Sequence, residues 1–395
     1  MTDQVLELKI IDLQKSIKAW AEERELWTDC GFKSYKEQFE DEPNEYASCV
    51  TVLYTEGALF SMLNGYAYSD YLEEFEVFMA TTGFYYEAYN HYIFSFYAED
   101  EVLNNAYIEY FEWQWVTELI KPDYTSLYEE VFEYFNKNPN DLYALHHRKY
   151  EILISEIFKN QGYRTELGSG TNDGGIDIKL FKKDDIDEII TLVQVKKYKP
   201  DLPIALEAVS SLSAIVNQEN ANRGLFVTTS RFLPVAQRFA LREKTRLTLA
   251  TSTEVSQWCE NAGKIISRDK SNLFSDKFLL KLLDTDHPND LVGKLLVASV
   301  GYGMVSNDFC VVVKDTPHIA LIMRVPRSIQ FEDQPYNTKG YEIPVLNEQI
   351  LAFRTKDNVF RAKKSKDPAG RITFAANKTL YVLWDGTKQY FDHID

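Results

Sequence analysis

Three polar side chains in the middle of the sequence are spaced so that they can meet in one site. Asp177 stands at the start of one predicted strand, and Gln194 and Lys196 stand two residues apart on the next. Because alternate residues of a strand share a face, Gln194 and Lys196 point the same way. A turn centred near residues 186–187 permits a register with Asp177 opposite Gln194 or Lys196, and in that register a carboxylate, an amide oxygen and an ammonium would converge.

A site of this kind suits the hydrolysis of a phosphodiester. Mg²⁺ prefers oxygen ligands, and a lysine beside the metal can orient or deprotonate the attacking water. Glu151, next to the apolar stripe of the preceding predicted helix, is a candidate second carboxylate. Two plainer interpretations stay open: Asp-Gly-Gly-Ile-Asp at 173–177 as a strand-entry turn, and Glu151 as a solvated helix residue.

Other polar residues nearby are interpreted as structural or as contacts to phosphate. His146 and His147 are adjacent rather than four apart, so their side chains diverge on a helix and we expect no metal pair. Lys197 and Lys199 are expected to touch phosphate or water. The run at 228–230, Thr-Thr-Ser, lacks the His and Asp partners of a nucleophile, and we expect it to end a core strand near the substrate.

Residues 150–250 alternate between helical and strand patterns, which predicts one mixed sheet flanked by helices. Apolar residues from Tyr150 to Phe158 recur at helical spacing, and Gly162 follows as a helix terminator. The predicted order is helix 150–158, strands 163–167, 176–181 and 189–195, helix 204–217, strand 224–228, helix 234–242 and strand 247–250.

The first 140 residues differ from the rest in charge and aromatic content. They contain 8 Lys and Arg against 28 Asp and Glu, whereas residues 141–395 contain 35 against 32. They also hold 31 of the 55 aromatic residues. Apolar spacing and scarce Gly and Pro predict a mainly helical domain, with helices at 5–26, 47–63, 71–96, 102–120 and 124–135. In the stretches after residue 26 the aromatic density blurs the period, so strands are an open alternative there.

This acidic domain is predicted to be an interaction or regulatory domain. Its charge makes it a poor DNA contact, and its Tyr and Trp are typical of protein interfaces. We therefore expect it to bind a partner protein or a second copy of the chain. Two alternatives stay open: a cover over the basic face of the central domain, and a domain whose charge only keeps it soluble.

The C-terminal part, residues 290–395, is predicted to be a small β-barrel-like domain, joined to the centre by a linker or helix at 263–289. Its strands are predicted at 295–300, 309–313, 319–325 and 380–384. A basic run at 361–366 favours a DNA-reading role, and a plain structural barrel with a solvated basic loop is the equal alternative.

The composition argues against several classes of protein. Cys30, Cys49, Cys259 and Cys310 form no Cys-x-x-Cys pair, so neither a disulfide scaffold nor a zinc knuckle is indicated. The longest apolar runs are strand-sized, far short of a membrane span. No basic stretch followed by an apolar one opens the chain. We expect a cytoplasmic protein with no membrane contact.

Several motifs, in order, resemble one known family. They are Asp-Gly-Gly-Ile-Asp at 173–177, Gln-x-Lys at 194–196, and Gly-Leu-Phe-Val-Thr-Thr-Ser at 224–230 with Phe232, Ala236 and Ala240 after it. With the predicted α-β-β-β-α-β order, they resemble an Mrr-type restriction endonuclease domain of the PD-(D/E)xK nuclease superfamily. The resemblance spans residues 142–260 and leaves 1–140 and 290–395 uncovered.

The predicted fold class is therefore a multidomain chain. Composition and pattern predict the mainly α N-terminal domain (1–140) and the small β domain, and the resemblance implies a central α/β nuclease domain with a mixed sheet (141–262). The family's catalytic motif maps onto Glu151, Asp177, Gln194 and Lys196. Its metal, Mg²⁺ with Mn²⁺ as a substitute, would be bound by Asp177, Gln194 and the main-chain carbonyl of Val195. Gln194 replaces the acid of the superfamily name, as is usual in the Mrr branch.

The expected function is therefore that of a metal-dependent endonuclease that cleaves double-stranded DNA, in restriction of foreign DNA by analogy with the family. A repair or junction-resolving nuclease of the same superfamily is the first alternative. The second is a binding or regulatory module on a nuclease scaffold, against which the intact Asp177 and Lys196 argue.

Overall fold

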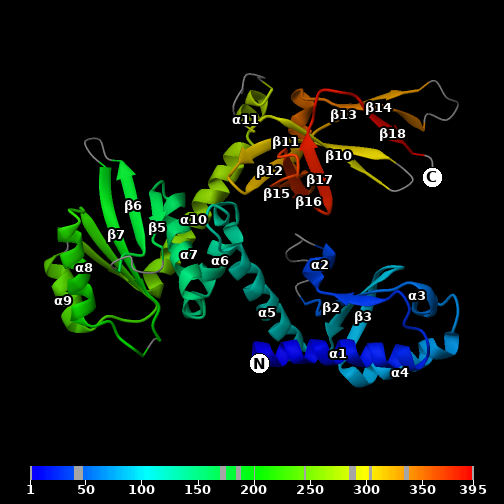
Figure 1. The fold of residues 1–395 in the computed structure, drawn as a ribbon, viewed down its shortest axis with the longest axis horizontal. Helices are drawn as coiled ribbons and strands as arrows, with labels where there is room; N and C mark the ends of the chain where they lie inside the picture. Colours follow the sequence, from blue (N-terminus) through cyan, green and yellow to red (C-terminus); the bar gives the residue numbers. More distant parts are fainter. Residues whose placement is uncertain are drawn as a thin grey trace. The chain divides into compact units, whose positions relative to one another are not determined.

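The chain forms two compact units, residues 1–115 (unit 1) and 116–395 (unit 2). The computed structural model describes residues 2–39, 48–169, 175–183, 188–199, 201–243, 246–283, 291–301, 305–332 and 338–393 (Figure 1). The predicted acidic domain, 1–140, thus lies on both sides of the division. Within the described ranges, no helix is both long and apolar enough to cross a membrane.

Unit 1 combines helices with a four-stranded antiparallel sheet in the order β1-β2-β4-β3. Leu13 and Ile17 of the first helix share a core with Phe75, Phe94 and Phe96. The elements are α1 (Asp3–Glu23), β1 (Gly31–Lys33), α2 (Tyr35–Phe39), β2 (Thr51–Tyr54), α3 (Gly57–Leu63), α4 (Ser69–Thr82), β3 (Phe84–Asn90), β4 (Ile93–Ala98) and α5 (Glu101–Leu119).

The predicted helix over residues 71–96 is wrong in its second half, and the one over 47–63 is wrong in its first. α4 gives way to Gly83, whose φ of +75° is left-handed, and residues 84–98 then form the antiparallel pair β3–β4. Residues 51–54 form β2. The cause is composition: Tyr and Phe occur in both structures but favour strands, and their density hid the alternation.

The division between the units also separates the charge. Residues 1–115 contain 6 Lys and Arg against 23 Asp and Glu, a balance of −17, which is the net charge of the whole chain. Residues 116–395 contain 37 of each. Unit 2 therefore has no net charge with which to repel a polyanion.

The central part of unit 2 is a five-stranded mixed sheet in the order β5-β6-β7-β8-β9. The first three strands are antiparallel and the last three parallel, as the predicted element order implies. The elements are η1 (Thr125–Leu127), α6 (Glu129–Lys137), η2 (Pro139–Tyr143), α7 (His147–Asn160), β5 (Arg164–Leu167), β6 (Ile178–Lys183), β7 (Glu188–Lys196), α8 (Leu206–Gln218), β8 (Arg223–Thr228), α9 (Pro234–Arg242), β9 (Leu247–Ala250), α10 (Ser252–Leu273) and α11 (Asp276–Lys281).

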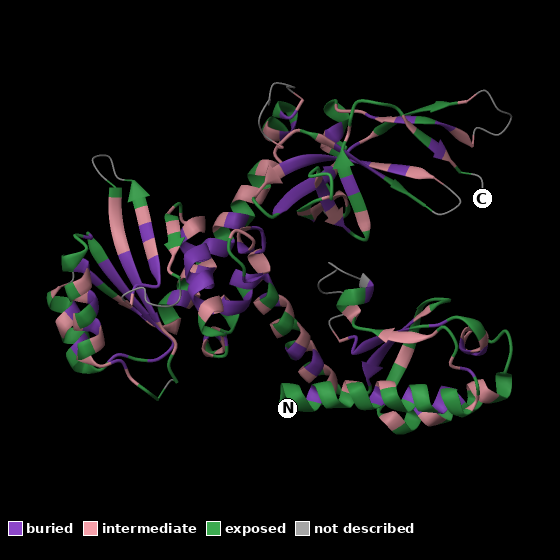
Figure 2. Ribbon diagram, in the orientation of Figure 1, coloured by how far each residue is buried: buried purple, intermediate pink, exposed green. Residues whose placement is uncertain are grey.

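Helices cover both faces of this sheet. α8 and α9 lie on one face, where Leu192 and Phe226 pack against Val209, Leu212 and Ala236. α7 and α10 lie on the other, and Figure 2 shows how fully α7 is buried there. α10 runs unbroken from residue 252 to 273, so the predicted boundary between residues 262 and 263 falls inside one helix.

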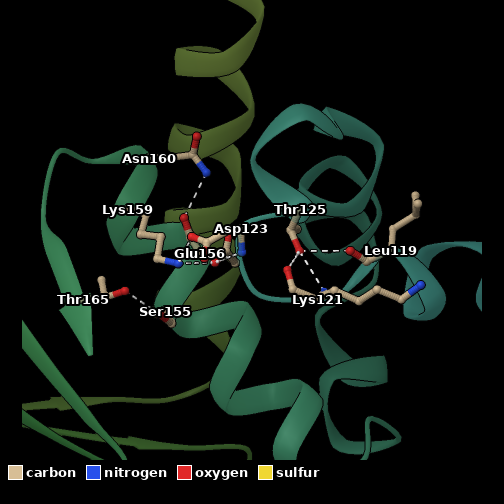
Figure 3. A network of polar contacts seen from close by, with 9 residues as sticks. All are labelled: Leu119, Lys121, Asp123, Thr125, Ser155, Glu156, Lys159, Asn160 and Thr165. Carbon is tan, nitrogen blue, oxygen red and sulfur yellow. Dashed lines mark hydrogen bonds and ion pairs between the residues drawn. The ribbon is translucent and has the colours of Figure 1, made fainter. Parts of the chain in front are cut away.

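A buried polar network fastens α7 to the loop that follows α5 (Figure 3). Glu156, fully buried, accepts hydrogen bonds from the Asp123 backbone N–H at 3.1 Å and from Lys159 at 2.8 Å. Burial raises the pKa of Glu156 despite these partners. Burial lowers the pKa of Lys159, but its bonds to Asp123 and Glu156 outweigh that and raise it above 10.5. Lys159 therefore neutralises a carboxylate that water cannot reach.

Lys159→Met is expected to destabilise unit 2 by about 3 kcal/mol at pH 7, because it leaves the buried Glu156 carboxylate without its cation. The loss should shrink near pH 4, where Glu156 binds a proton in both the folded and the unfolded state. Urea unfolding of the full chain at both pH values measures this. Lys264→Met breaks an exposed pair with Glu260 and should cost at most about 0.5 kcal/mol. Equal losses in the two variants would contradict the prediction.

The C-terminal region contains the predicted barrel. Strands β10-β11-β12-β15-β16-β17 close on themselves around an apolar interior, and β13-β14-β18 form a separate sheet. The elements are β10 (Leu295–Val300), β11 (Ser306–Asp315), β12 (Ile319–Arg324), β13 (Arg327–Phe331), β14 (Lys339–Pro344), η3 (Glu348–Phe353), η4 (Lys356–Asn358), β15 (Val359–Lys366), β16 (Ile372–Ala376), β17 (Thr379–Leu383) and β18 (Gln389–Asp392).

The basic run on β15 is only partly available to a polyanion. Arg361 forms a two-pronged ion pair with Glu130, at 2.8 and 3.0 Å, and also contacts Glu129. Lys364 pairs with Asp315 at 2.5 Å. Lys363 and Lys366 are exposed. The run therefore offers a polyanion these two exposed cations, while Arg361 joins the barrel to α6.

Candidate active site

The β6–β7 pair brings two of the predicted site residues next to each other. The paired register ends at Ile178 and Val193, and Asp177 then hydrogen-bonds to Val193 and Val195, the residues on either side of Gln194. Leu192 packs beneath α8 and α9, and alternation places Gln194 and Lys196 on that same face at the carboxyl end of β7. The start of the Asp-Gly-Gly motif and the hairpin turn, residues 170–174 and 184–187, lie outside the described residues.

Asp177 makes three hydrogen bonds to the main chain. Its Oδ2 accepts a hydrogen bond from the Val195 N–H at 2.6 Å, and its own N–H donates to the Val193 carbonyl at 2.9 Å. The Gly168 N–H donates to its carbonyl at 2.7 Å. The side chain is 6% exposed. These hydrogen bonds fix the position of the carboxylate beside Val195, at the edge of β7 just beyond the Ile178–Val193 pair.

Gln194 has an acceptor atom that lacks a partner. Its Oε1 is buried and accepts no hydrogen bond from the described residues. Gly175, with φ +86°, lies over the amide, and a Cβ there would stand 3.1 Å from Nε2. A buried acceptor without a donor is unfavourable unless something else satisfies it. A cation bound beside Gln194 would do so.

The three predicted metal ligands all offer an oxygen atom. In an extended strand the N–H and carbonyl of a residue point to the same edge, so the Val195 carbonyl lies on the edge that Asp177 occupies. Asp177, Gln194 and Val195 thus offer three oxygens, the donor type suited to Mg²⁺. Across the described ranges, no three His, Cys, Asp or Glu side chains gather as a metal cluster, and this set contains only one of those types. The residues fit a hard cation.

Lys196 is the last residue of β7 and is half-buried. Among the described residues its ammonium has no hydrogen-bond or ion-pair partner, whereas Lys197 lies 5.3 Å over the ring of Tyr143. Since Lys196 shares a face with Gln194, its ammonium is available at the predicted site.

Glu151 comes from the opposite layer, in the first turns of α7. It is 1% exposed, and its two oxygens contact His147 Nδ1 and Arg148 Nη1, both at 2.7 Å. α7 also packs against β5, β6 and β7. In this arrangement Glu151 contacts two side chains of its own helix, the His147 imidazole and the Arg148 guanidinium. Its participation with Asp177 remains a prediction.

Sequence reasoning missed the contacts that two groups of residues make. His147 and Arg148 stand four and three residues before Glu151, a spacing that signals contact on a helix and would have revealed both. His146 instead caps α7. The hydroxyls of residues 228–230 bind the segment after β7, which no local pattern indicates, because that contact joins residues about thirty positions apart.

The comparison with protein families falls on the same part of the chain. Residues 142–259 match the family model Mrr_cat, described as a restriction endonuclease. The central domain is similar to restriction endonucleases of this family. The match confirms the resemblance on which the sequence-based prediction rested, and its bounds enclose α7, the whole mixed sheet and every predicted site residue.

More distant similarities cover smaller shares. The uncharacterized protein y4cE of Sinorhizobium fredii is 26% identical over 129 residues, 32% of this chain and 33% of that protein. Among solved structures, the MspJI restriction endonuclease in complex with a 27-mer oligonucleotide is 19% identical over 37% of this chain and 36% of that one, with a TM-score of 0.26. The DNA modification-dependent restriction endonuclease AspBHI is 14% identical over 48% and 60%, with a TM-score of 0.25. This chain therefore spans about a third of the curated relative's length.

Proposed function

We propose that this protein is a metal-dependent endonuclease that cleaves double-stranded DNA. The observation that carries the proposal is the placement of Asp177, Gln194 and Lys196 together at the carboxyl end of β7, inside a domain that matches a restriction endonuclease family. Ligands of mixed α/β sheets bind where parallel strands end. Unit 2, without net charge, does not oppose the approach of a duplex.

In this proposal Asp177, Gln194 and the Val195 carbonyl hold Mg²⁺, or Mn²⁺ in its place. The ion would supply Lewis-acid neutralisation of the scissile phosphate. Lys196 orients the attacking water and stabilises the negative charge that develops on the phosphate. The hydrogen bond from Val195 to Asp177 keeps the carboxylate from turning away. Glu151, with Arg148 beside it, is proposed to assist from α7.

The biological role that fits is restriction of foreign DNA in the cytoplasm, by analogy with the family. A repair or junction-resolving nuclease is the alternative within the same chemistry, and a preference for branched over linear duplex would favour it. A non-catalytic binding module is the alternative outside enzymes.

The decisive experiment incubates the purified full chain with linear, circular, methylated and single-stranded DNA and with RNA. Each substrate is tested with Mg²⁺, with Mn²⁺ and with EDTA. Cleavage of duplex DNA that requires the metal supports the proposal. DNA binding without cleavage under any of these conditions would instead favour the non-catalytic module.

The barrel is proposed to bind DNA phosphates through Lys363 and Lys366. Replacing both with alanine should lower the slope of log Kd against log salt concentration by about two, one for each phosphate that is no longer neutralised. Filter binding or fluorescence anisotropy across a salt series measures it. The charge-matched variant Lys15→Ala/Lys18→Ala, in unit 1, should leave the slope unchanged. An unchanged slope in the barrel variant would remove the DNA-reading role and leave a structural barrel.

Unit 1 is proposed to bind a second copy of the chain through an exposed aromatic cluster. Phe60 stacks on Tyr92 at 4.8 Å, and Tyr66 and Tyr92 are 63% and 56% exposed. Because unit 1 has a charge of −17, self-association through this cluster should strengthen with salt, which screens the repulsion.

Sedimentation of the full chain tests this prediction. Its mean mass at one concentration should rise between low and high salt. Tyr66→Ser/Tyr92→Ser should weaken association about tenfold, by removing aromatic contact area. Val77→Ser removes an equally exposed apolar group from α4 and serves as the control. The mass of a single chain at every salt and protein concentration would contradict self-association.

A further inference from the structure

Two chain segments run side by side beyond the carboxyl ends of β7 and β8. The parallel ladder between these strands reaches Lys196 opposite Thr228. The segments then separate and meet again where Ile204 pairs with Phe232. The first of them begins with three cations in four positions, Lys196, Lys197 and Lys199, which we call the lysine segment (residues 196–199). This is the place in the sheet where a bound ligand would lie.

Three consecutive hydroxyls bridge the gap between these segments. Thr228 Oγ1 donates to the Lys196 carbonyl at 2.7 Å, and Thr229 Oγ1 donates to the Tyr198 carbonyl at 2.8 Å. Ser230 Oγ donates to the Leu202 carbonyl at 2.6 Å. The three residues are 0%, 7% and 7% exposed. Side-chain hydroxyls therefore take over from the backbone ladder where the strands part.

These hydrogen bonds exclude a catalytic role for the three hydroxyls as nucleophiles or proton donors. Each hydroxyl has one proton, and each donates that proton to a main-chain carbonyl. What the bonds control is the direction of the backbone. A fixed carbonyl at Lys196 fixes the Cα from which its side chain leaves. A fixed carbonyl at Tyr198 holds the peptide between Tyr198 and Lys199, and with it the backbone between the other two lysines.

We propose that Thr228 and Thr229 are positioning residues with separate duties. Thr228 orients Lys196 for catalysis, and Thr229 holds Lys197 and Lys199 where they contact the DNA backbone. Ser230 anchors the far end of the same loop. This inference rests on the proposed nuclease function. It differs from a purely structural role because it predicts that two neighbouring hydroxyls affect different kinetic quantities.

The test compares Thr228→Val and Thr229→Val, which keep the shape and remove the hydroxyl, in the full chain. Thr228→Val should lower kcat about tenfold or more, with DNA affinity unchanged, because it misplaces a group that acts in the transition state. Thr228→Ser should restore kcat, since it returns the donor. Thr229→Val should lower the salt slope of DNA binding by about one for each phosphate that a displaced lysine no longer neutralises. At saturating DNA its kcat should fall far less than that of Thr228→Val.

Thr248→Val on β9 is the matched control, an exposed threonine of the same sheet, and should behave as wild type. Circular dichroism and thermal unfolding verify that each variant folds.

If Thr228→Val does not fold, Thr229→Val decides the proposal through its binding slope. Wild-type kcat and wild-type binding in both variants would overturn it, as would equal decreases of kcat and affinity in both. A wild-type chain that never cleaves DNA refutes the proposed function instead, and the Thr229→Val binding slope then still tests the second duty.

Discussion

Asp177→Asn is expected to lower DNA cleavage by at least about a thousandfold. A metal ligand stabilises the charged transition state by several kcal/mol, and each 1.4 kcal/mol corresponds to about a tenfold change in rate. Asparagine retains the oxygen that accepts the Val195 N–H at 2.6 Å, so the fold should persist. The substitution thus removes the negative charge and little else. Asp177→Ala should be equally inactive.

Single-turnover cleavage with excess enzyme measures the effect without interference from product release. Asp269→Asn, at a half-exposed position on α10, is the matched control and should cleave at the wild-type rate. Thermal unfolding should show that Asp177→Asn melts close to the wild type. Cleavage by Asp177→Asn within about tenfold of wild type, still dependent on metal, would show that the metal is held elsewhere.

Lys196→Ala is expected to lower the cleavage rate by about a hundred- to a thousandfold, with modest effect on DNA affinity. Removing one group that stabilises transition-state charge typically has an effect of that size. The ammonium is available for this role, because it has no partner among the described residues. Lys183→Ala, an exposed lysine on β6 of the same sheet, is the control.

Lys196→Arg separates charge stabilisation, which is proposed for this lysine, from deprotonation of the attacking water, which would need a neutral amine. Arginine keeps the positive charge but does not give up its proton, so it can stabilise charge without accepting a proton from water. Rescue of Lys196→Ala by arginine would indicate charge stabilisation, and no rescue would indicate proton transfer or a strict shape requirement. Full activity of Lys196→Ala would remove Lys196 from the site.

Local pattern was sufficient for the central domain because its elements depend on neighbouring residues. The apolar stripe from Tyr150 to Phe158 appears as α7, and every predicted strand and helix between residues 163 and 250 is present within a few positions. The shared face of Gln194 and Lys196 follows from the two-residue period of a strand, which holds in any register and which only a bulge between the two residues would break.

Pattern failed where aromatic residues dominate and where contacts are long-range. Tyr and Phe at 8 of the 15 positions of residues 84–98 gave no clear period. These residues form strands through the β3–β4 pairing and the pairing of β4 with β2. The basic run on β15 suggested a surface open to DNA, but Arg361 binds Glu129 and Glu130, more than two hundred residues earlier.

The sequence by itself determined the order of elements in the central domain, the residue types at the candidate site and the common face of two of them, since these depend on short-range periodicity and on side-chain chemistry. Only the tertiary structure decided that Asp177 bonds to Val193 and Val195 beside Gln194, that Glu151 binds His147 and Arg148, and that residues 228–230 hold the lysine segment. Register and packing determine these features, through contacts between residues distant in sequence and through the rotamers that burial selects. A local sequence pattern contains no information about either.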